Sequence, residues 1–323
     1  MIEYSKPETL HHFLPMRFFE HKKEVLRKPV DLSAFGIEGF QLTVLREDLL
    51  HPVVSGNKFR KLKYNFYQAK KEGYSRLITF GGAFSNHILA VACAARECSF
   101  QSIGIIRGEE LVHKWANNAT LSRASEFGMR LHFVSRFEFR QKDQPGYQES
   151  LQREFGPSYM IPEGGTNELA VRGCEEILSK SDTSHDYICT SVGTGGTMAG
   201  IVRSAGTDQH VIGYSALKGT FQREVIDLYT EKTDYTMTDA WCFGGYAKID
   251  SDLVRFINEF RSKTGIPLDP VYTGKMMYGI IDGMRNGYFR ENSRILAVHT
   301  GGLQGIAGMN QILKQKNLPL LHE

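Results

Sequence analysis

The chain has 323 residues, with 39 basic and 36 acidic side chains and a formal net charge of +3. At about 150 residues per domain, this length predicts two domains. The balanced charge and the hydrophobic content of 41% exclude a disordered chain and a nucleic-acid binder that depends on a basic surface. Glycine stands out, because 32 of the 323 residues are glycine. That share is about 10%, against roughly 7% in average proteins.

The five cysteines and the hydropathy pattern bear on the compartment. An odd cysteine count without C-x-x-C spacing argues against a disulfide framework and against a zinc site. No apolar segment approaches the ~18 residues that cross a membrane, and the first residues lack the apolar core of a signal peptide. We therefore expect a cytoplasmic protein with reduced thiols, no membrane partner and no bound metal.

Short β-branched or aromatic runs alternate with helical patterns along the chain. The predicted strands are 41–46, 76–80, 102–106, 131–134, 159–161, 187–192, 210–214 and 294–299. The predicted helices are 58–71, 86–98, 118–127, 169–178, 198–205 and 275–285. Turn-forming residues predict loops at 141–147 and 179–185. Strands that alternate with crossover helices predict an α/β fold with mostly parallel sheets.

Four of the five adjacent glycine pairs directly follow a predicted strand. They lie in TFGGAFSN (79–86), IPEGGTN (161–167), CTSVGTGGT (189–197) and AVHTGG (297–302). Parallel α/β sheets bind ligands outside the carboxyl ends of their strands, where glycine lets the backbone come close. We therefore expect the four turns to surround one ligand, the alternative being that each pair merely eases a tight turn. The fifth pair, 244–245, is predicted to lie in a loop only.

The segment GTGGT (193–197) is the best candidate for a phosphate site, because it leaves a strand and opens a helix. Peptide N–H groups, the positive helix end and two threonine hydroxyls suit a phosphate. The segment is neither a P-loop nor a complete G-x-G-x-x-G, which favours a monophosphate cofactor over a dinucleotide. The candidate ligands are Gly193, Thr194, Gly195, Gly196 and Thr197.

Lys58 follows the segment SGN (55–57), whose residues are good N-caps, so we expect it in the first turn of a helix. A cation is electrostatically disfavoured there, which lowers its pKa and makes the amine a better nucleophile. The alternative is a solvated basic face, because three further basic residues follow within five positions.

Four motifs carry a family resemblance: SGNKFRKL (55–62), GGAFSNH (81–87), DPVYTGK (269–275) and HTGG (299–302). In this order and spacing, they resemble the family of D-cysteine desulfhydrase and 1-aminocyclopropane-1-carboxylate (ACC) deaminase. These are pyridoxal-phosphate (PLP) enzymes of the tryptophan-synthase-β fold, and the likeness runs from about residue 40 to 305.

The resemblance implies the architecture as well as the cofactor. Two open, mostly parallel three-layer α/β domains would hold PLP in the cleft between them. The smaller domain, 61–161, would be inserted into a larger one made of 1–60 plus 162–323. The resemblance also implies a homodimer.

The resemblance further implies roles for named residues. Lys58 would be joined covalently to PLP and would later take the substrate α-proton. Ser85, Asn86 and His87 would bind the substrate carboxylate at a helix start, and Asn86 would also bind the PLP 3′-oxygen. The loop 193–197 would take the phosphate, in agreement with the interpretation of its glycines above.

Tyr272 matches an active-site tyrosine of the family that lies near the substrate. Three other positions distinguish the members of this family. Thr273, Thr300 and His87 follow the desulfhydrase pattern, where ACC deaminases carry glutamate, leucine and glutamine. A glutamate beside the pyridine nitrogen would keep it protonated, as ring opening requires, whereas a threonine hydroxyl can only donate a hydrogen bond. With Thr273 and Thr300 as cofactor contacts, we expect α,β-elimination that converts D-cysteine to pyruvate, sulfide and ammonia.

Three alternatives stay open: an ACC deaminase, a nicotinamide-dependent oxidoreductase, and a PLP-binding protein without turnover. Two further residues bear on the choice of substrate. Glu163 stands where the family commonly has an apolar residue, and its carboxylate faces either the pocket or, as we favour, solvent. Lys218 follows a predicted strand and is expected on the surface rather than in the pocket.

Overall fold

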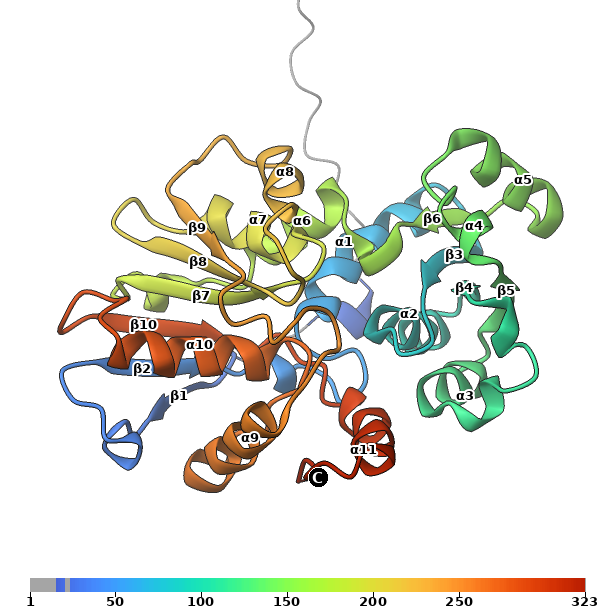
Figure 1. The fold of residues 1–323 in the computed structure, drawn as a ribbon. Coiled ribbons are helices and arrows are strands. Elements are labelled where there is room, and N and C mark those ends of the chain that lie inside the picture. The colour runs from blue at the N-terminus through green and yellow to red at the C-terminus, as the bar shows by residue number, and fades with distance from the viewer. Residues whose placement is uncertain (1–15, 21–23, 323) are drawn as a thin grey trace, which may run out of the picture.

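The computed structural model describes residues 16–20 and 24–322. These residues form two lobes, each built around its own sheet with helices on both faces (Figure 1). Neighbouring strands are parallel everywhere except for one antiparallel pair at an edge of the larger sheet. The predicted α/β architecture with two three-layer domains is confirmed.

The larger lobe contains a six-stranded sheet and the smaller lobe a four-stranded sheet. The order of the larger sheet is β1 (Arg27–Val30), β2 (Gln41–Leu45), β10 (Arg294–Val298), β7 (Tyr187–Val192), β8 (His210–Ser215) and β9 (Tyr235–Thr238). The order of the smaller sheet is β5 (Arg130–Val134), β4 (Gln101–Arg107), β3 (Arg76–Gly81) and β6 (Tyr159–Ile161). All strands of the smaller sheet lie within residues 76–161, so we propose domain boundaries near residues 61 and 161.

Helices cover both faces of each sheet (Figure 1). In the smaller lobe they are α2 (Asn86–Glu97), α3 (Ala119–Glu126), α4 (Arg136–Phe139) and α5 (Pro145–Phe155). In the larger lobe they are α6 (Glu168–Glu175), α7 (Gly196–Ser204), α8 (Gln222–Asp227), α9 (Ser251–Thr264), α10 (Thr273–Arg285) and α11 (Gly305–Gln315). Between the lobes lies α1 (Asn57–Lys71), whose apolar face packs in the core of the smaller lobe.

All eight predicted strands and all six predicted helices form, with ends shifted by three residues or fewer. Two short edge strands, β1 and β9, escaped prediction. The sequence of β1, RKPV, contains two cations and a proline, which are tolerated at a sheet edge but do not read as a strand. Helices α4, α5, α8, α9 and α11 were also missed. The predicted loop 141–147 is wrong in part, because Pro145 occupies the first helical position of α5, where proline is favoured.

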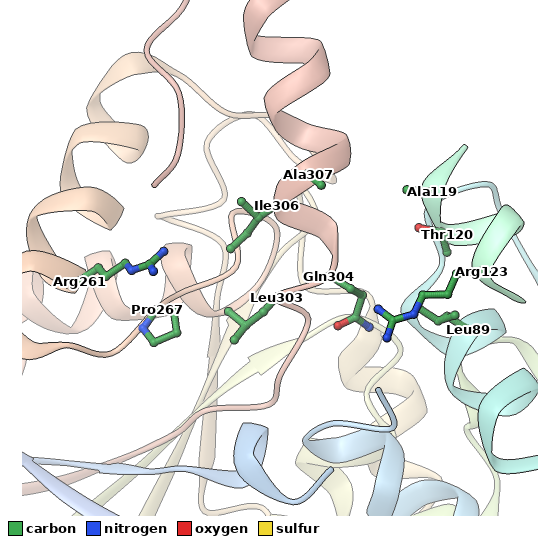
Figure 2. A pocket seen from close by; sticks show the side chains of 10 residues that line it. All are labelled: Leu89, Ala119, Thr120, Arg123, Arg261, Pro267, Leu303, Gln304, Ile306 and Ala307. Atoms are coloured by element: carbon green, nitrogen blue, oxygen red, sulfur yellow. The ribbon is translucent and has the colours of Figure 1, made fainter. Parts of the chain in front are cut away.

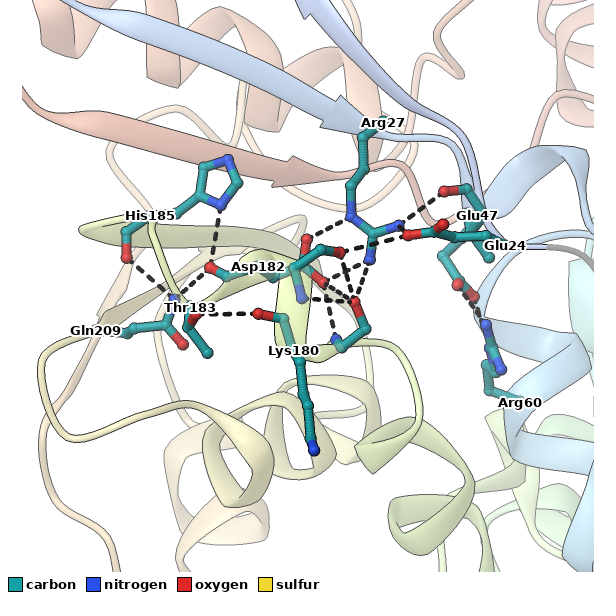
Figure 3. Close-up of polar contacts among 12 residues, drawn as sticks. Glu24, Arg27, Glu47, Arg60, Lys180, Asp182, Thr183, His185 and Gln209 are labelled. Carbon is teal, nitrogen blue, oxygen red and sulfur yellow. Dashed lines mark hydrogen bonds and ion pairs between the residues drawn. The ribbon is translucent and has the colours of Figure 1, made fainter.

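The predicted loop 179–185 is an ordered turn that ties β1 to the larger lobe. Asp182 is 1% exposed and accepts hydrogen bonds from Arg27 at 2.6 and 2.7 Å (Figure 3). Its second oxygen also accepts the backbone N–H of Ser179, which completes a capping box. Together these bonds hold the edge strand that the sequence pattern missed.

Close contact between α1 and α6 fixes the position of α1. A Cβ atom on Gly173 of α6 would lie 2.0 Å from the carbonyl oxygen of Arg60, so only glycine allows this approach. One face of α1 therefore lies against α6 of the larger lobe, while its apolar face packs in the core of the smaller lobe. This is the helix that carries Lys58.

The helices and the cysteines bear on the compartment of the protein. In the part of the chain that the structure describes, no helix combines the length and apolarity that a membrane crossing needs. The five cysteines are all unpaired.

Candidate active site

The four glycine-rich turns that follow strands meet at one place between the lobes. A Cβ atom on Gly164 would lie 3.1 Å from the Thr194 hydroxyl, and one on Gly165 would lie 3.0 Å from the His87 ring. A Cβ atom on Gly302 would lie 3.1 Å from the side-chain nitrogen of Asn86. Each turn thus touches another, and the predicted convergence of the four turns is confirmed.

The turn 193–197 follows β7 and leads directly into α7. Gly195 has a φ of +87° and precedes α7, so the first N–H groups of this helix lack intrahelical partners. A Cβ atom on Gly196 would lie 2.9 Å from the Thr166 hydroxyl and 3.3 Å from Nζ of Lys61. Glycine therefore leaves room here for a group that faces both a helix N-terminus and a lysine.

Lys61 is a buried cation at this turn that the sequence analysis did not assign. Its side chain is 1% exposed, and Nζ donates to the Gly164 carbonyl, the Thr166 hydroxyl and the Thr194 hydroxyl at 2.9, 2.9 and 3.2 Å. Burial, with a contribution from nearby Lys58, lowers the pKa of Lys61 to about 7. A buried amine with only neutral oxygen partners, beside a helix N-terminus, fits the phosphate group of PLP.

The basic-face alternative for the start of α1 is wrong. Arg60 pairs with buried Glu47 at 2.7 Å (Figure 3), and Lys63 pairs with Glu176 at 2.7 Å. With Lys61 buried as well, none of these cations forms a freely solvated face. The missed signal was spacing, since residues three apart on a helix share a face. Lys61 therefore points to the same side of α1 as Lys58.

Lys58 lies in the first turn of α1, as predicted. Nζ is 3.3 Å from Oδ1 of Asn57, and the pKa of Lys58 is lowered to about 8. The direction agrees with prediction, but burial is the main cause rather than the helix start. Asn57 also donates from its side chain to the Thr197 hydroxyl at 2.8 Å and from its backbone to the Thr300 carbonyl at 3.3 Å. Asn57 thus ties the start of α1, and with it Lys58, to the turns 193–197 and 299–302.

Two threonines were predicted near the cofactor ring, and the structure treats them differently. The Thr300 and Ser191 hydroxyls lie 3.0 Å apart at the ends of neighbouring strands β10 and β7. The Thr273 hydroxyl is fully buried, donates to Oδ1 of Asp269 at 2.7 Å and accepts the Asp269 N–H at 2.9 Å. Its proton is thus engaged in capping α10, so the hydroxyl available for a ring nitrogen belongs to Thr300 or Ser191.

Tyr272 covers the start of the turn 193–197, the candidate phosphate turn. Its ring lies over Gly193, where a Cβ atom would be 3.1 Å from Cε1 of the tyrosine. Burial, reinforced by neighbouring Tyr246, raises the pKa of Tyr272 well above its usual range. The Tyr272 hydroxyl therefore keeps its proton at neutral pH.

Tyr246 is a second tyrosine at the site, and the sequence analysis missed it. Its ring centre is 6.1 Å from that of Tyr272. It follows the fifth glycine pair, whose φ angles of +81° and +112° are disfavoured for other residues. Buried Lys275 holds this loop by donating to the carbonyls of Cys242 and Gly245, both at 2.7 Å. The loop of this glycine pair, for which no role was predicted, therefore brings the Tyr246 ring to the site.

The smaller lobe contributes the N-terminus of α2. Ser85 is the N-cap, and its hydroxyl accepts the Ile88 N–H at 3.3 Å. The His87 ring is 2% exposed and lies 2.8 Å from the Thr79 hydroxyl. Burial lowers the pKa of His87 well below its usual value. Because this neutral ring packs against β3, the group that His87 offers to a ligand at the helix start is its backbone N–H.

Two residues of unassigned role lie at the margin of the site. The Glu163 carboxylate is 3.5 Å from Nζ of Lys142, and its side chain is 36% exposed. It is also among the charges that raise the pKa of Tyr272, so the partly exposed carboxylate of Glu163 lies in the neighbourhood of that tyrosine. Lys218 is exposed, as predicted.

Comparisons with known proteins identify the family. The model of the family "Pyridoxal-phosphate dependent enzyme" matches residues 29–301. A Thermotoga maritima protein provisionally named 1-aminocyclopropane-1-carboxylate deaminase is 32% identical, over 85% of this chain and 93% of its own. The mitochondrial bifunctional D-cysteine desulfhydrase/1-aminocyclopropane-1-carboxylate deaminase of Arabidopsis thaliana is 28% identical, over 94% and 83%. The crystal structure of an ACC deaminase homologue covers 91% of this chain and 94% of its own, with 26% identity and a TM-score of 0.77. The chain belongs to the family of pyridoxal-phosphate-dependent enzymes.

Proposed function

We propose that this enzyme is a carbon–sulfur lyase that removes the β-substituent and the amino group of a small amino acid, with D-cysteine as the substrate. The observation that carries the proposal is the pair of lysines on one face of α1. Lys58 has a pKa of about 8, and Lys61 lies buried beside the phosphate turn. PLP, when bound, supplies an electron sink for the charge left at the substrate α-carbon once its proton is removed.

The residues that would hold the cofactor surround Lys58. The turn 193–197 and Lys61 would take the phosphate, since they combine a helix N-terminus, hydroxyls and a buried amine. Thr300, paired with Ser191, would donate to the ring nitrogen. Asn86 of the smaller lobe would bind the 3′-oxygen. The cofactor would therefore contact both lobes, but mainly the larger one.

The remaining groups suit binding and proton transfer. The Ser85 hydroxyl and the free N–H groups of α2 would bind the substrate carboxylate. Lys58 would take the α-proton, because a pKa of about 8 leaves part of its population neutral near pH 7. Tyr272, which stays protonated, would donate a proton to the departing thiolate, with Tyr246 holding its ring in place.

The neutral residues expected around the ring nitrogen favour elimination over ring opening. The Arabidopsis relative is named for both activities, so the choice between them rests on the residues near the ring nitrogen. The neutral hydroxyls of Thr300 and Ser191 would lie there, and the neighbouring Asp269 carboxylate already accepts three backbone N–H groups and the Thr273 hydroxyl. A neutral ring nitrogen is a weaker electron sink, which suffices when a good leaving group departs.

A substrate panel tests the proposal. We expect the PLP-loaded enzyme to release pyruvate from D-cysteine and β-chloro-D-alanine, with much less from L-serine and D-serine and little 2-oxobutyrate from ACC. Lys58→Ala should abolish the visible absorbance of the loaded enzyme and lower pyruvate release by about 10³-fold. Lys63→Ala, which removes a cation paired with Glu176 outside the site, is the matched control. Preferential release of 2-oxobutyrate from ACC, or unchanged turnover in Lys58→Ala, would refute it.

We further propose that the enzyme is a homodimer in the cytoplasm. The family resemblance supports the dimer, and five unpaired cysteines suit a reducing compartment. Light scattering of the purified protein should give twice the chain mass of 36.5 kDa.

A further inference from the structure

A cavity of about 450 Å³ opens between the two lobes, on the side of α3 and α11 (Figure 2). The smaller lobe contributes residues of α2 and α3 to its walls, and the larger lobe contributes residues of α9, α11 and the segment that precedes α11. None of the residues assigned above to the cofactor or to the substrate lines this cavity. It is therefore distinct from the candidate active site, although Leu89 in its wall lies one turn after Asn86 on α2.

The walls combine apolar surface with two arginines. Leu89, Leu303 and Ile306 supply aliphatic side chains. Arg123 reaches in from α3 toward the larger lobe, and Arg261 reaches in from the opposite wall on α9 (Figure 2). Two cations therefore face one largely apolar space from opposite sides.

Both guanidinium groups have donors to spare. Arg261 donates one N–H to the carbonyl of His322 at 2.5 Å, and the Arg123 guanidinium lies over the ring of Phe127 at 5.9 Å. Within residues 16–20 and 24–322, neither arginine forms an ion pair with a carboxylate. An arginine presents five N–H donors in a fork that matches a carboxylate, and such pairs are among the strongest hydrogen bonds in proteins.

We propose that this cavity binds a small amphipathic carboxylate, with an aliphatic body against the leucines and isoleucine and its carboxylate on Arg123 or Arg261. The volume lies within the range of small-molecule sites, which are mostly apolar with a few polar anchors. Charge selects an anion over a cation or a neutral molecule.

A bound carboxylate would touch both lobes at once and so would fix their separation. The helix α2 carries Ser85 and Asn86 at its start and Leu89 in the cavity wall. Occupancy would therefore alter the KM of the amino-acid substrate, a consequence that rests on the function proposed above. Linkage requires the reverse as well, so a bound substrate would change the affinity for the carboxylate by the same factor.

Calorimetry on the PLP-loaded enzyme tests the site, with octanoate, octan-1-ol and octylamine as probes of equal chain length. We expect octanoate to bind one site per chain, octan-1-ol at least tenfold more weakly, and octylamine not at all. At least one of Arg123→Gln and Arg261→Gln should weaken octanoate about tenfold, the loss of roughly one charged hydrogen bond, and the weakened variant identifies the arginine that holds the carboxylate. Arg255→Gln, which removes an exposed arginine of α9 paired with Asp252, should leave the affinity unchanged.

Ser85→Ala separates this site from the substrate site, because octanoate should bind this variant as it binds the parent enzyme. The proposal is overturned if octan-1-ol binds as well as octanoate, if both arginine variants bind octanoate unchanged, or if Ser85→Ala abolishes its binding. It is also overturned if light scattering shows that the arginine variants dissociate into monomers, since the cavity would then belong to a subunit interface. These readouts need no turnover, so failure of the pyruvate assay would leave the binding result intact.

Discussion

The carboxyl ends of the two sheets differ in how firmly they hold their turns. In the larger lobe a Cβ atom on Gly56 would lie 2.0 Å from the Thr300 carbonyl oxygen, and Asn57 bonds Thr197 at 2.8 Å. In the smaller lobe the loop before α2 exposes 52% of Phe84, and a Cβ atom on Gly308 of α11 would lie 3.3 Å from the Phe84 ring. Backbone contacts hold the turns of the larger lobe, whereas the turn of the smaller lobe exposes a large side chain, and we expect it to be the more mobile of the two.

This contrast assigns separate tasks to the two lobes. The rigid turns of the larger lobe suit a cofactor that stays bound through many cycles. The looser loop of the smaller lobe suits a substrate that must enter and leave. Variants in the larger lobe should therefore change the affinity for the cofactor, and variants in the smaller lobe should change the KM of the substrate.

Lys61→Met gives the largest effect of this kind. Removal of a buried cation from the phosphate turn should weaken cofactor binding by about 100-fold, at the upper end of what a charged hydrogen bond contributes. Titration of the apoenzyme with PLP measures the affinity, and Lys63→Met is the matched control. At saturating PLP we expect the KM for D-cysteine to stay within about threefold of the parent. A cofactor affinity equal to that of the parent would remove Lys61 from the phosphate site.

Ser85→Ala should show the opposite pattern. Loss of the hydroxyl that begins α2 should raise the KM for D-cysteine about tenfold, because one hydrogen bond to the carboxylate is lost. The affinity for PLP should change by less than about twofold. Steady-state kinetics and cofactor titration on the same preparation separate the two constants. If cofactor affinity fell as far as in Lys61→Met, the division of tasks between the lobes would be wrong.

What could be predicted from the sequence follows the range of the interactions involved. The strands and the turns after them are encoded locally, by β-branched runs that end in glycine pairs, and the structure contains all of them. The place of Lys58 in the first turn of a helix was predicted from the N-cap residues before it, and its role was implied by the family resemblance. Lys61 and Tyr246 were missed because their partners are distant in sequence: Lys61 bonds the Thr194 hydroxyl, 133 positions away. The hydrogen bond from the Thr273 hydroxyl to Asp269, which removes this hydroxyl as a donor to the cofactor ring, likewise depends on the geometry of the α10 cap and was not predicted.

The lowered pKa of Lys58 predicts how cofactor loading depends on pH. The neutral amine is the reacting form, so the rate at which apoenzyme combines with PLP should rise about tenfold per pH unit below pH 8. Above about pH 8 it should level off, rather than continue to rise toward the ordinary lysine value of 10.5. Stopped-flow absorbance measures this rate. A continued rise to pH 10 would show that Lys58 is solvated in the apoenzyme.

The same lysines make a signed prediction about stability. The folded-state pKa values of Lys58 and Lys61, about 8 and about 7, lie below the unfolded value of 10.5. Between pH 7 and 10.5 the unfolded chain therefore binds more protons, so these groups make the free energy of unfolding of the apoenzyme rise with pH. Lys61→Met should flatten this rise in urea titrations at pH 7, 8 and 9.

The variant Tyr246→Phe tests whether the loop of Tyr246 belongs to the rigid turns of the larger lobe that hold the cofactor. This loop is held by Lys275, which donates to the backbone carbonyls of Cys242 and Gly245, both at 2.7 Å. Tyr246→Phe keeps the ring against Tyr272 but removes the hydroxyl, so we expect kcat to fall only about threefold, with cofactor affinity unchanged. Because Tyr246 also raises the pKa of Tyr272, the alkaline limb of the kcat profile should shift to lower pH in this variant. A loss of cofactor affinity would instead show that the loop carrying Tyr246 belongs to the rigid turns that hold the cofactor. The mobile part of the site would then be confined to the smaller lobe.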